Sequence, residues 1–287
     1  MILQLFITGI SMGMVYALMA MGLILIVKAV NVMNFAHGQI FMVGGYLGYF
    51  FSNQLGMNSL VSFILTILAL MVFGVIYMFT VYWPLRNASW PVTVTISTLG
   101  ASIALTEAVR LIWGPFALKV APIVDGSLPL FGSKLQYQYV FLIVVGVVCI
   151  VFVYNLFEKF RVGRVMSAAT QDSYAAELMG IPIVLTVTAT YMISLALSGI
   201  GGWLSAPLFL VSQTLGNFAL KAFAGIVVGG FGSVKGAVIG SIMIGLIEAY
   251  SIIITTTYRD AIVFLVLILV LLFRPQGIYG EEIEEKA

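Results

Sequence analysis

The chain has 287 residues, of which 62% are hydrophobic and only 8% are charged, and its mean hydropathy is +1.14. A soluble domain carries about 25% charged residues, so this composition excludes a soluble globular protein and predicts a surface that faces lipid. The formal net charge of +2 is too small to indicate a nucleic-acid partner.

Apolar runs follow one another along the whole chain. Lipid offers the backbone no hydrogen-bond partner, so long runs without alternation predict transmembrane helices. Two runs, 36–52 and 218–231, are short and glycine-rich, and each predicts a broken helix or a segment that enters and returns. We therefore expect an all-α polytopic membrane protein, a bundle of about eight to nine transmembrane helices with broken or re-entrant segments. The runs cover approximately 2–27, 36–52, 58–82, 92–113, 138–157, 182–204, 218–231, 234–256 and 260–273.

The first run has no basic segment before it and is too long for a signal peptide, so it predicts a retained helix. Between it and the second run lies "NVMNFAHGQIFMVGGYLG", which holds Asn31, Asn34, Gly38 and the single histidine, His37. Polar side chains there can satisfy backbone groups freed where one helix ends and a broken helix begins. Structural capping, lining of a pathway and proton chemistry all remain open for these residues.

Ionisable residues inside the apolar runs are few. Glu107 and Arg110 are three residues apart, a spacing that predicts a local ion pair on a helix. Glu248 has no lysine or arginine near it in sequence, so it is the better candidate for a polar bundle interior or a pathway.

Glycine and serine spacing predicts where helices pack closely. Ser194, Ser198 and Gly202 form one small-residue stripe, and Gly236 and Gly240 belong to another. Small residues four apart allow helix backbones to approach each other in lipid. In "GIVVGGFGSVKG", residues 225–236, glycines are too dense for a continuous helix, which predicts a break.

The loop at about 158–181 is the most basic one, so we expect it in the cytoplasm. Asp172 is a good N-cap for a short helix, and Gly180 followed by proline is a typical stop. Such a helix would offer a small, mildly apolar face to a soluble partner, formed by Ala175, Ala176 and Met179.

Alternating outward from this loop places the C-terminus in the cytoplasm. Eight of the 13 lysines and arginines then lie inside, and nine crossings would put the N-terminus outside. Lys221 and Arg259 are counted as outside. No linker is present, so 1–287 is expected to form one membrane domain with a short tail, 274–287. The single cysteine, Cys149, rules out an intramolecular disulfide.

No sequence motif indicates catalysis or an energy source. The chain has no phosphate-binding loop, no H-E-x-x-H and no Cys/His metal spacing. An enzyme and a bound cofactor are therefore not expected. Uphill transport would need energy from another subunit or from an ion gradient.

Four segments in order resemble the permease subunits of branched-chain amino-acid ABC importers, most closely the shorter permease type. They are "NVMNFAHGQIFMVGGYLG", "GRVMSAATQDSYAAELMGI", "VVGGFGSVKGAVIGSIMIGLIEA" and "LLFRPQGIYG". The resemblance implies a pathway for branched-chain or related amino acids in the cytoplasmic (inner) membrane. It also implies a second related permease, two cytoplasmic ATPases that bind ATP and Mg, and an extracytoplasmic substrate-binding protein.

The family's coupling segment corresponds to Arg164–Ile181, with Gln171, Asp172, Ala175, Ala176 and Gly180 at matching positions. Its asparagine–histidine–glycine motif corresponds to Asn34, His37 and Gly38. Related systems for urea and short amides share these motifs. A stand-alone channel or facilitator and an ion-coupled secondary transporter remain the alternatives.

Overall fold

A computed structural model describes residues 2–90, 92–130, 133–160, 163, 165, 166, 169 and 173–280. Its helices follow the predicted apolar runs within a few residues. The third and fourth predicted runs, for example, become α3 with a π-helical end and the helix α4. The helices are α1 Ile2–Val30, α2 His37–Tyr49, α3 Ser59–Tyr77, α4 Val92–Trp113, α5 Tyr137–Glu158, α7 Ser173–Leu178, α8 Ile183–Ser205, α9 Phe218–Gly229, α10 Val234–Ser251 and α11 Arg259–Phe273.

Among the described residues, six helices are long and apolar enough to cross a membrane: α1, α3 with its π-helical continuation, α4, α5, α8 and α10. Three further apolar helices, α2, α9 and α11, are shorter. The structure thus confirms a polytopic helical bundle with short segments.

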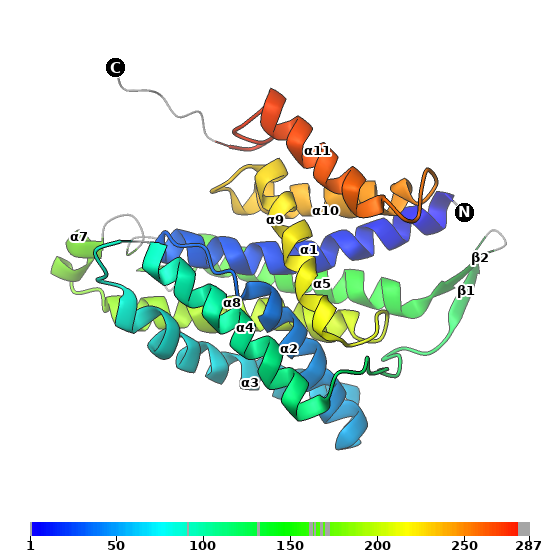
Figure 1. Ribbon diagram of the computed structural model, residues 1–287, viewed down its shortest axis with the longest axis horizontal. Coiled ribbons are helices and arrows are strands. Elements are labelled where there is room, and N and C mark those ends of the chain that lie inside the picture. The colour runs from blue at the N-terminus through cyan, green and yellow to red at the C-terminus, as the bar shows by residue number, and fades with distance from the viewer. Residues whose placement is uncertain are drawn as a thin grey trace.

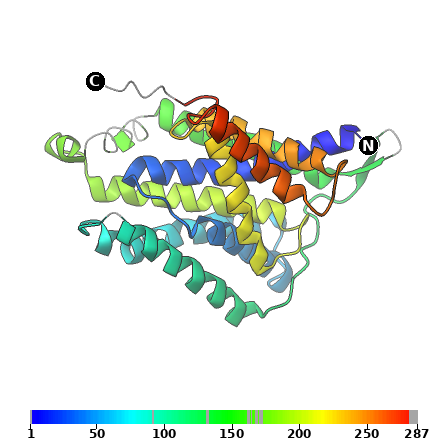
Figure 2. The same cartoon turned by 45° about the horizontal axis from the view of Figure 1, so that its top comes forward.

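The helix α1 forms the centre of the bundle. It is almost entirely buried and packs against α10, α8, α5 and α9. The helices α3, α4 and α5 expose most of their surface on the outside of the bundle, and Figure 2 shows α4 at its edge. The short helix α7 lies at the opposite end of the longest axis from the N-terminal end of α1 (Figure 1).

Close backbone approaches explain the glycine pattern. A Cβ on Gly236 would meet the backbone of Gly229, and one on Gly240 would meet the backbones of Gly225 and Gly229. The predicted stripe on α8 also packs as expected: Ser194 donates to the Gly22 carbonyl at 2.6 Å, joining α8 to α1. These contacts confirm tight helix packing through small residues.

The break predicted within residues 225–236 is present. The helix α9 ends at Gly229 and α10 begins at Val234. Gly230 and Gly232 have φ of 114° and 101°, a region that favours glycine. The Ser233 side chain then caps α10 by accepting from the Gly236 amide at 3.1 Å.

One feature differs from the all-α expectation. Between α4 and α5 the chain forms an antiparallel hairpin of β1, Ser127–Leu130, and β2, Ser133–Gln136. A single bridge also joins Leu118 to Val211, with both backbone bonds at 2.8 Å. This connection lies outside the apolar runs, where water allows strand pairing without a closed barrel.

Candidate translocation and coupling sites

The connection between α1 and α2 is organised by its two asparagines. Asn31 ends α1 in the left-handed region, with φ of 51°, and its amide donates to the Val27 carbonyl at 2.8 Å. The Asn34 Oδ1 accepts from the Ala36 amide at 3.1 Å and from the Tyr77 hydroxyl at 2.7 Å. Asn31 therefore terminates α1, as the capping interpretation predicts. Asn34 instead binds the amide of Ala36, the residue just before α2, and no side chain in the described part of the chain caps the first turn of α2.

The helix α2 begins deep inside the bundle. His37, its first residue, lies 3.1 Å from the Met19 carbonyl through Nε2. Met19 lies about 16 Å along α1 from the end of that helix at Val30. The connecting chain must therefore return into the bundle before α2 starts. The helix α2 continues as the π-helical segment Phe50–Gln54, and we call it a half-helix because it starts partway along α1.

Protein surrounds this non-helical backbone. The Phe35 amide donates to Thr98 Oγ1 of α4 at 3.1 Å. Ser198 of α8 donates to the His37 carbonyl at 3.2 Å. Irregular backbone at membrane depth is tolerated where protein supplies the hydrogen bonds, and here α4 and α8 supply them.

A second half-helix starts beside the first. A Cβ on Gly38 would clash with the Gly216 carbonyl, in the short 3₁₀ turn Gln213–Asn217 that leads into α9. From this junction α2 runs toward Trp203 at the C-terminal end of α8, whereas α9 runs toward the start of α10. The two half-helices thus leave the junction in opposite directions. The sequence predicted each short run separately, but not that their starts meet.

Buried polar groups surround the junction. His37 and Asn34 are only 1% and 3% exposed. Within the described residues, His37 Nδ1 and Asn34 Nδ2 have no hydrogen-bond partner. Asn31 differs because it is exposed and lines a cavity of about 1050 Å³ with Lys28 and Arg86. Asn31, Asn34, His37 and Gly38 therefore lie in one region of the fold, but they do not line one open surface.

Glu248 does not stand alone. Its Oε1 lies 2.6 Å from Lys221 Nζ of α9, and its Oε2 accepts from the Tyr16 hydroxyl of α1 at 2.5 Å. Lys221 also lies 2.8 Å from Asp260 of α11. This buried cluster joins four helices, and both Lys221 and Glu248 are nearly inaccessible.

Two predicted positions gain their contacts here. Lys221 lies within α9, inside the predicted run 218–231, and its side chain is buried. Glu248 lies in the bundle interior, as the sequence predicted, and although no cation is near it in sequence, Lys221 reaches it from 27 residues away. No local pattern could indicate this pair, because helix packing creates it.

The pair of Glu107 and Arg110 confirms the local prediction. Arg110 Nη1 lies 3.2 Å from Glu107 Oε1, and the two side chains are 53% and 54% exposed for glutamate and arginine respectively. The pair lies on the outer face of α4, so it takes no part in the junction of the half-helices.

The short helix α7 contains two of the predicted coupling residues, Ala175 and Ala176, and Met179 and Gly180 follow it directly. It ends as expected: Gly180 has φ of 80°, and the Ile181 amide donates to the Ala176 carbonyl at 3.0 Å, a Schellman-type stop. Met179 is 83% exposed. Gln171 and Asp172 lie outside the described residues, so the proposed N-cap stays a prediction.

The predicted apolar face of α7 requires one correction. Ala176 is only 5% exposed and is buried against its own chain, so it does not belong to a face shared with Met179. Leu178, 73% exposed, was missed although it is apolar and beside Met179. Glu177 and Gly180 line the same cavity as Lys28 and Arg86, which places α7 next to the ends of the membrane helices.

No group of three or more His, Cys, Asp or Glu side chains in the described part of the chain could hold a metal ion. The buried Glu248 cluster combines acids with Lys221 and Tyr16, which satisfy its charge and hydrogen bonds internally. Its chemistry is that of a structural ion pair between helices.

Comparison with known proteins agrees with this architecture. The family described as "Branched-chain amino acid transport system / permease component" matches residues 5–271. The chain is 31% identical to "High-affinity branched-chain amino acid transport system permease protein BraD" of Pseudomonas aeruginosa, over 99% of this chain and 97% of that protein. It is 29% identical to the corresponding protein LivH of Escherichia coli, with the same coverage of both chains.

A solved structure described as "PsaBC from Streptococcus pneumoniae in complex with Fab" is similar in fold. The TM-score is 0.51, with 95% of this chain and 92% of that chain covered and 12% sequence identity. The family match covers most of the sequence, and it includes both half-helices, the buried cluster and α7. The chain therefore belongs to the family of branched-chain amino acid transport system permease components.

Proposed function

We propose that this chain is the membrane-spanning permease subunit of an ABC importer for branched-chain or related small amino acids. In this assembly an extracytoplasmic binding protein delivers the substrate, a second related permease completes the pathway, and two cytoplasmic ATPases that bind ATP and Mg supply the energy. The permease itself is non-catalytic. The observation that carries the proposal is the end of α7, where Leu178 and Met179 expose apolar side chains at one end of a bundle of a permease family.

The helix α7 has the chemistry of a docking element for a soluble subunit. Leu178 and Met179 project apolar side chains that are 73% and 83% exposed. The helix lies beyond the end of α5 and just before α8, so it is outside the membrane-spanning segments. Gln171, Asp172, Ala175 and Gly180 belong to the same proposed coupling segment. A force on α7 would reach the bundle directly through α8.

The junction of the two half-helices is the proposed pathway wall. Asn31, Asn34, His37 and Gly38 contribute to it mainly by shape, because two of them are buried and Gly38 allows the contact with Gly216. Glu248 supports the same wall by holding α9 against α10 through Lys221. A pathway that is formed mainly by shape discriminates weakly between similar small substrates. The binding protein therefore supplies most of the substrate selectivity.

The proposed orientation places α7 and the C-terminus on the cytoplasmic side of the inner membrane. The basic loop before α7 supports this side. The N-terminal end of α1 lies at the other end of the bundle (Figure 2), so the proposed orientation has it on the outer side of the membrane.

The test is affinity purification of the tagged chain in mild detergent after co-expression with its neighbouring transport genes. We expect both ATPases and a second permease to be retained. A chain that is recovered alone, with uptake of leucine unaffected by loss of the ATPases, would refute the importer and favour a facilitator.

Matched variants of α7 sharpen this test. Met179→Asp places a charge on the proposed docking face and should release the ATPases, whereas Met179→Leu should retain them. Because Met179 is 83% exposed, neither change should affect the thermal stability of the permease. Equal retention by both variants would remove α7 from the contact.

A further inference from the structure

The outer face of α4 is unlike the other outer faces of the bundle. The helices α4 and α5 bury equally little of their surface, and α3 buries only slightly more. Yet α4 is clearly the least apolar of the three. Its six serines and threonines are half-buried or buried, so the polar groups that it exposes are Glu107 and Arg110, whereas α5 contains no serine or threonine.

The charges of α4 point outward. Glu107 and Arg110 are 53% and 54% exposed in the isolated chain. Glu107 lies about 9 Å before the end of α4, well inside the helix. Among the described residues of the six candidate spans, this is the one ion pair that is half exposed. Charged groups inside transmembrane segments normally face protein or water and not lipid.

The same face of α4 has open space beside Gly100. Gly100 has no atom within 4 Å of the position that a Cβ would occupy. Ile103, 67% exposed, lies beside it on the outward side. Nothing in the described part of the chain therefore covers this part of α4. The exposed face of α5 consists of apolar side chains such as Val144 and Val148, at 55% and 61% exposure, which suits lipid. The outer side of α4 also exposes apolar side chains such as Ile96 and Leu99, but it combines them with the ion pair.

We propose that the outer face of α4, defined by Gly100, Ile103, Glu107 and Arg110, docks a transmembrane helix of the second permease subunit. This inference rests on the proposed function. The partner helix must bring polar or charged groups to the depth of Glu107 and Arg110. The guanidinium retains donors beyond the two bonds from Nη1 to Glu107, so it can bind an acceptor across the interface.

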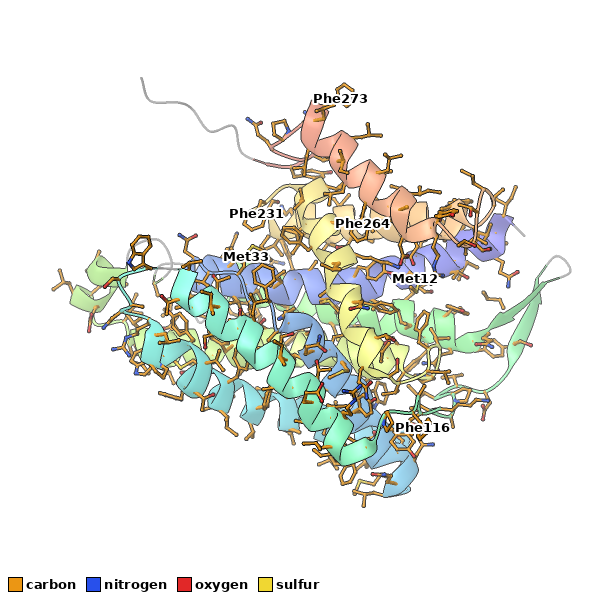
Figure 3. All side chains as sticks on the ribbon, viewed as in Figure 1. Met12, Met33, Phe116, Phe231, Phe264 and Phe273 are labelled. Atoms are coloured by element: carbon orange, nitrogen blue, oxygen red, sulfur yellow. The ribbon has the colours of Figure 1, made fainter. Side chains whose placement is uncertain are left out.

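Position excludes the other subunits of the importer. The C-terminal end of α4 contacts the C-terminal end of α2 through the ring pair of Trp113 and Tyr46, away from α7. Figure 3 shows Phe116, just after α4, far from α7. A cytoplasmic ATPase bound at α7 therefore cannot cover Glu107. A soluble binding protein cannot reach the middle of α4, where Gly100 and Ile103 lie.

Site-specific photo-cross-linking in the co-expressed complex tests this proposal. A benzophenone amino acid is placed at Ile103, and a matched probe is placed at Val148 of α5, which is similarly exposed. We expect a protein adduct with the second permease from Ile103 and not from Val148. An adduct from Val148 but not from Ile103, equal adducts from both positions, or no protein adduct from either would overturn the proposal.

A second variant separates docking from folding. Gly100→Leu adds a side chain where the isolated chain has open space, so its thermal stability should remain that of the wild type. Recovery of the second permease on purification should fall, while Val144→Leu should leave that recovery unchanged. Full recovery with Gly100→Leu would place this face toward lipid and refute the proposal.

The outcomes also distinguish this proposal from the importer assignment. If the wild type retains both ATPases but Ile103 gives no protein adduct, the importer stands and the docking face is wrong. If the wild type retains no ATPase, the importer assignment fails. An adduct between Ile103 and a second copy of the chain would then still support α4 as the docking face.

Discussion

The buried cluster around Glu248 predicts an asymmetric response to charge removal. Lys221 and Glu248 are 6% and 2% exposed, and breaking a buried ion pair by removing one partner typically costs about 3–5 kcal/mol. In Lys221→Met, Glu248 keeps the Tyr16 hydroxyl at 2.5 Å but has only Arg259, at 3.8 Å, as a cation. We expect a loss near the lower limit, about 3 kcal/mol.

The reverse substitution should be milder. In Glu248→Gln, Lys221 keeps Asp260 at 2.8 Å, and that carboxylate is 59% exposed and therefore well solvated. The glutamine can also still bind Tyr16. We expect a loss of about 1–2 kcal/mol, the scale of an impaired buried hydrogen bond. The double variant carries no buried unpaired charge, so it should be more stable than Lys221→Met alone.

The assay is the midpoint of thermal unfolding in one detergent, followed by the monodisperse fraction in size-exclusion chromatography. A change of 1 kcal/mol shifts the midpoint by roughly 2–4 °C in a chain of about 150–250 residues, so Lys221→Met should lower it by about 6–12 °C. The exposed Lys159→Met is the control and should shift it little. If Glu248→Gln destabilises as much as Lys221→Met, or the double variant is the least stable, the reasoning fails.

Three further predictions use matched variants. Gly236→Leu and Gly240→Leu insert a side chain against the backbone of α9 and should each lose about 1–3 kcal/mol by overpacking; unaltered thermal midpoints would contradict the observed contacts. Gly38→Ala should disrupt the junction with Gly216 and lower uptake of labelled leucine, whereas the Cβ of Gly45→Ala meets nothing closer than Leu215 at 3.4 Å and should be tolerated; equal uptake by both would exclude a tight junction. Ala176→Trp should reduce both the thermal midpoint and ATPase retention, because Ala176 is buried. Met179→Asp should reduce ATPase retention alone. A normal thermal midpoint for Ala176→Trp would contradict this, because it would show that α7 rearranges to accommodate the larger side chain.

Several features of the fold follow from local sequence alone. The run 92–113 became α4 with the same bounds, because in lipid an apolar segment must satisfy its own backbone and helix is the solution within one segment. The pair of Glu107 and Arg110 was equally predictable, since helix geometry brings residues three apart together. Gly180 also ended α7 as expected, because a left-handed residue closes a Schellman stop at little cost.

Features that depend on depth and on contacts between distant segments required the tertiary structure. The sequence indicated a short helix after Asn34, but the contact of His37 with Met19 decided that it starts midway through the bundle. The pairing of Glu248 with Lys221 likewise arises from the packing of α9 on α10. Hydrophobicity and spacing specify which segments leave water and which residues share a helix face. They do not specify which faces meet, because that choice depends on the fit of whole helices to one another.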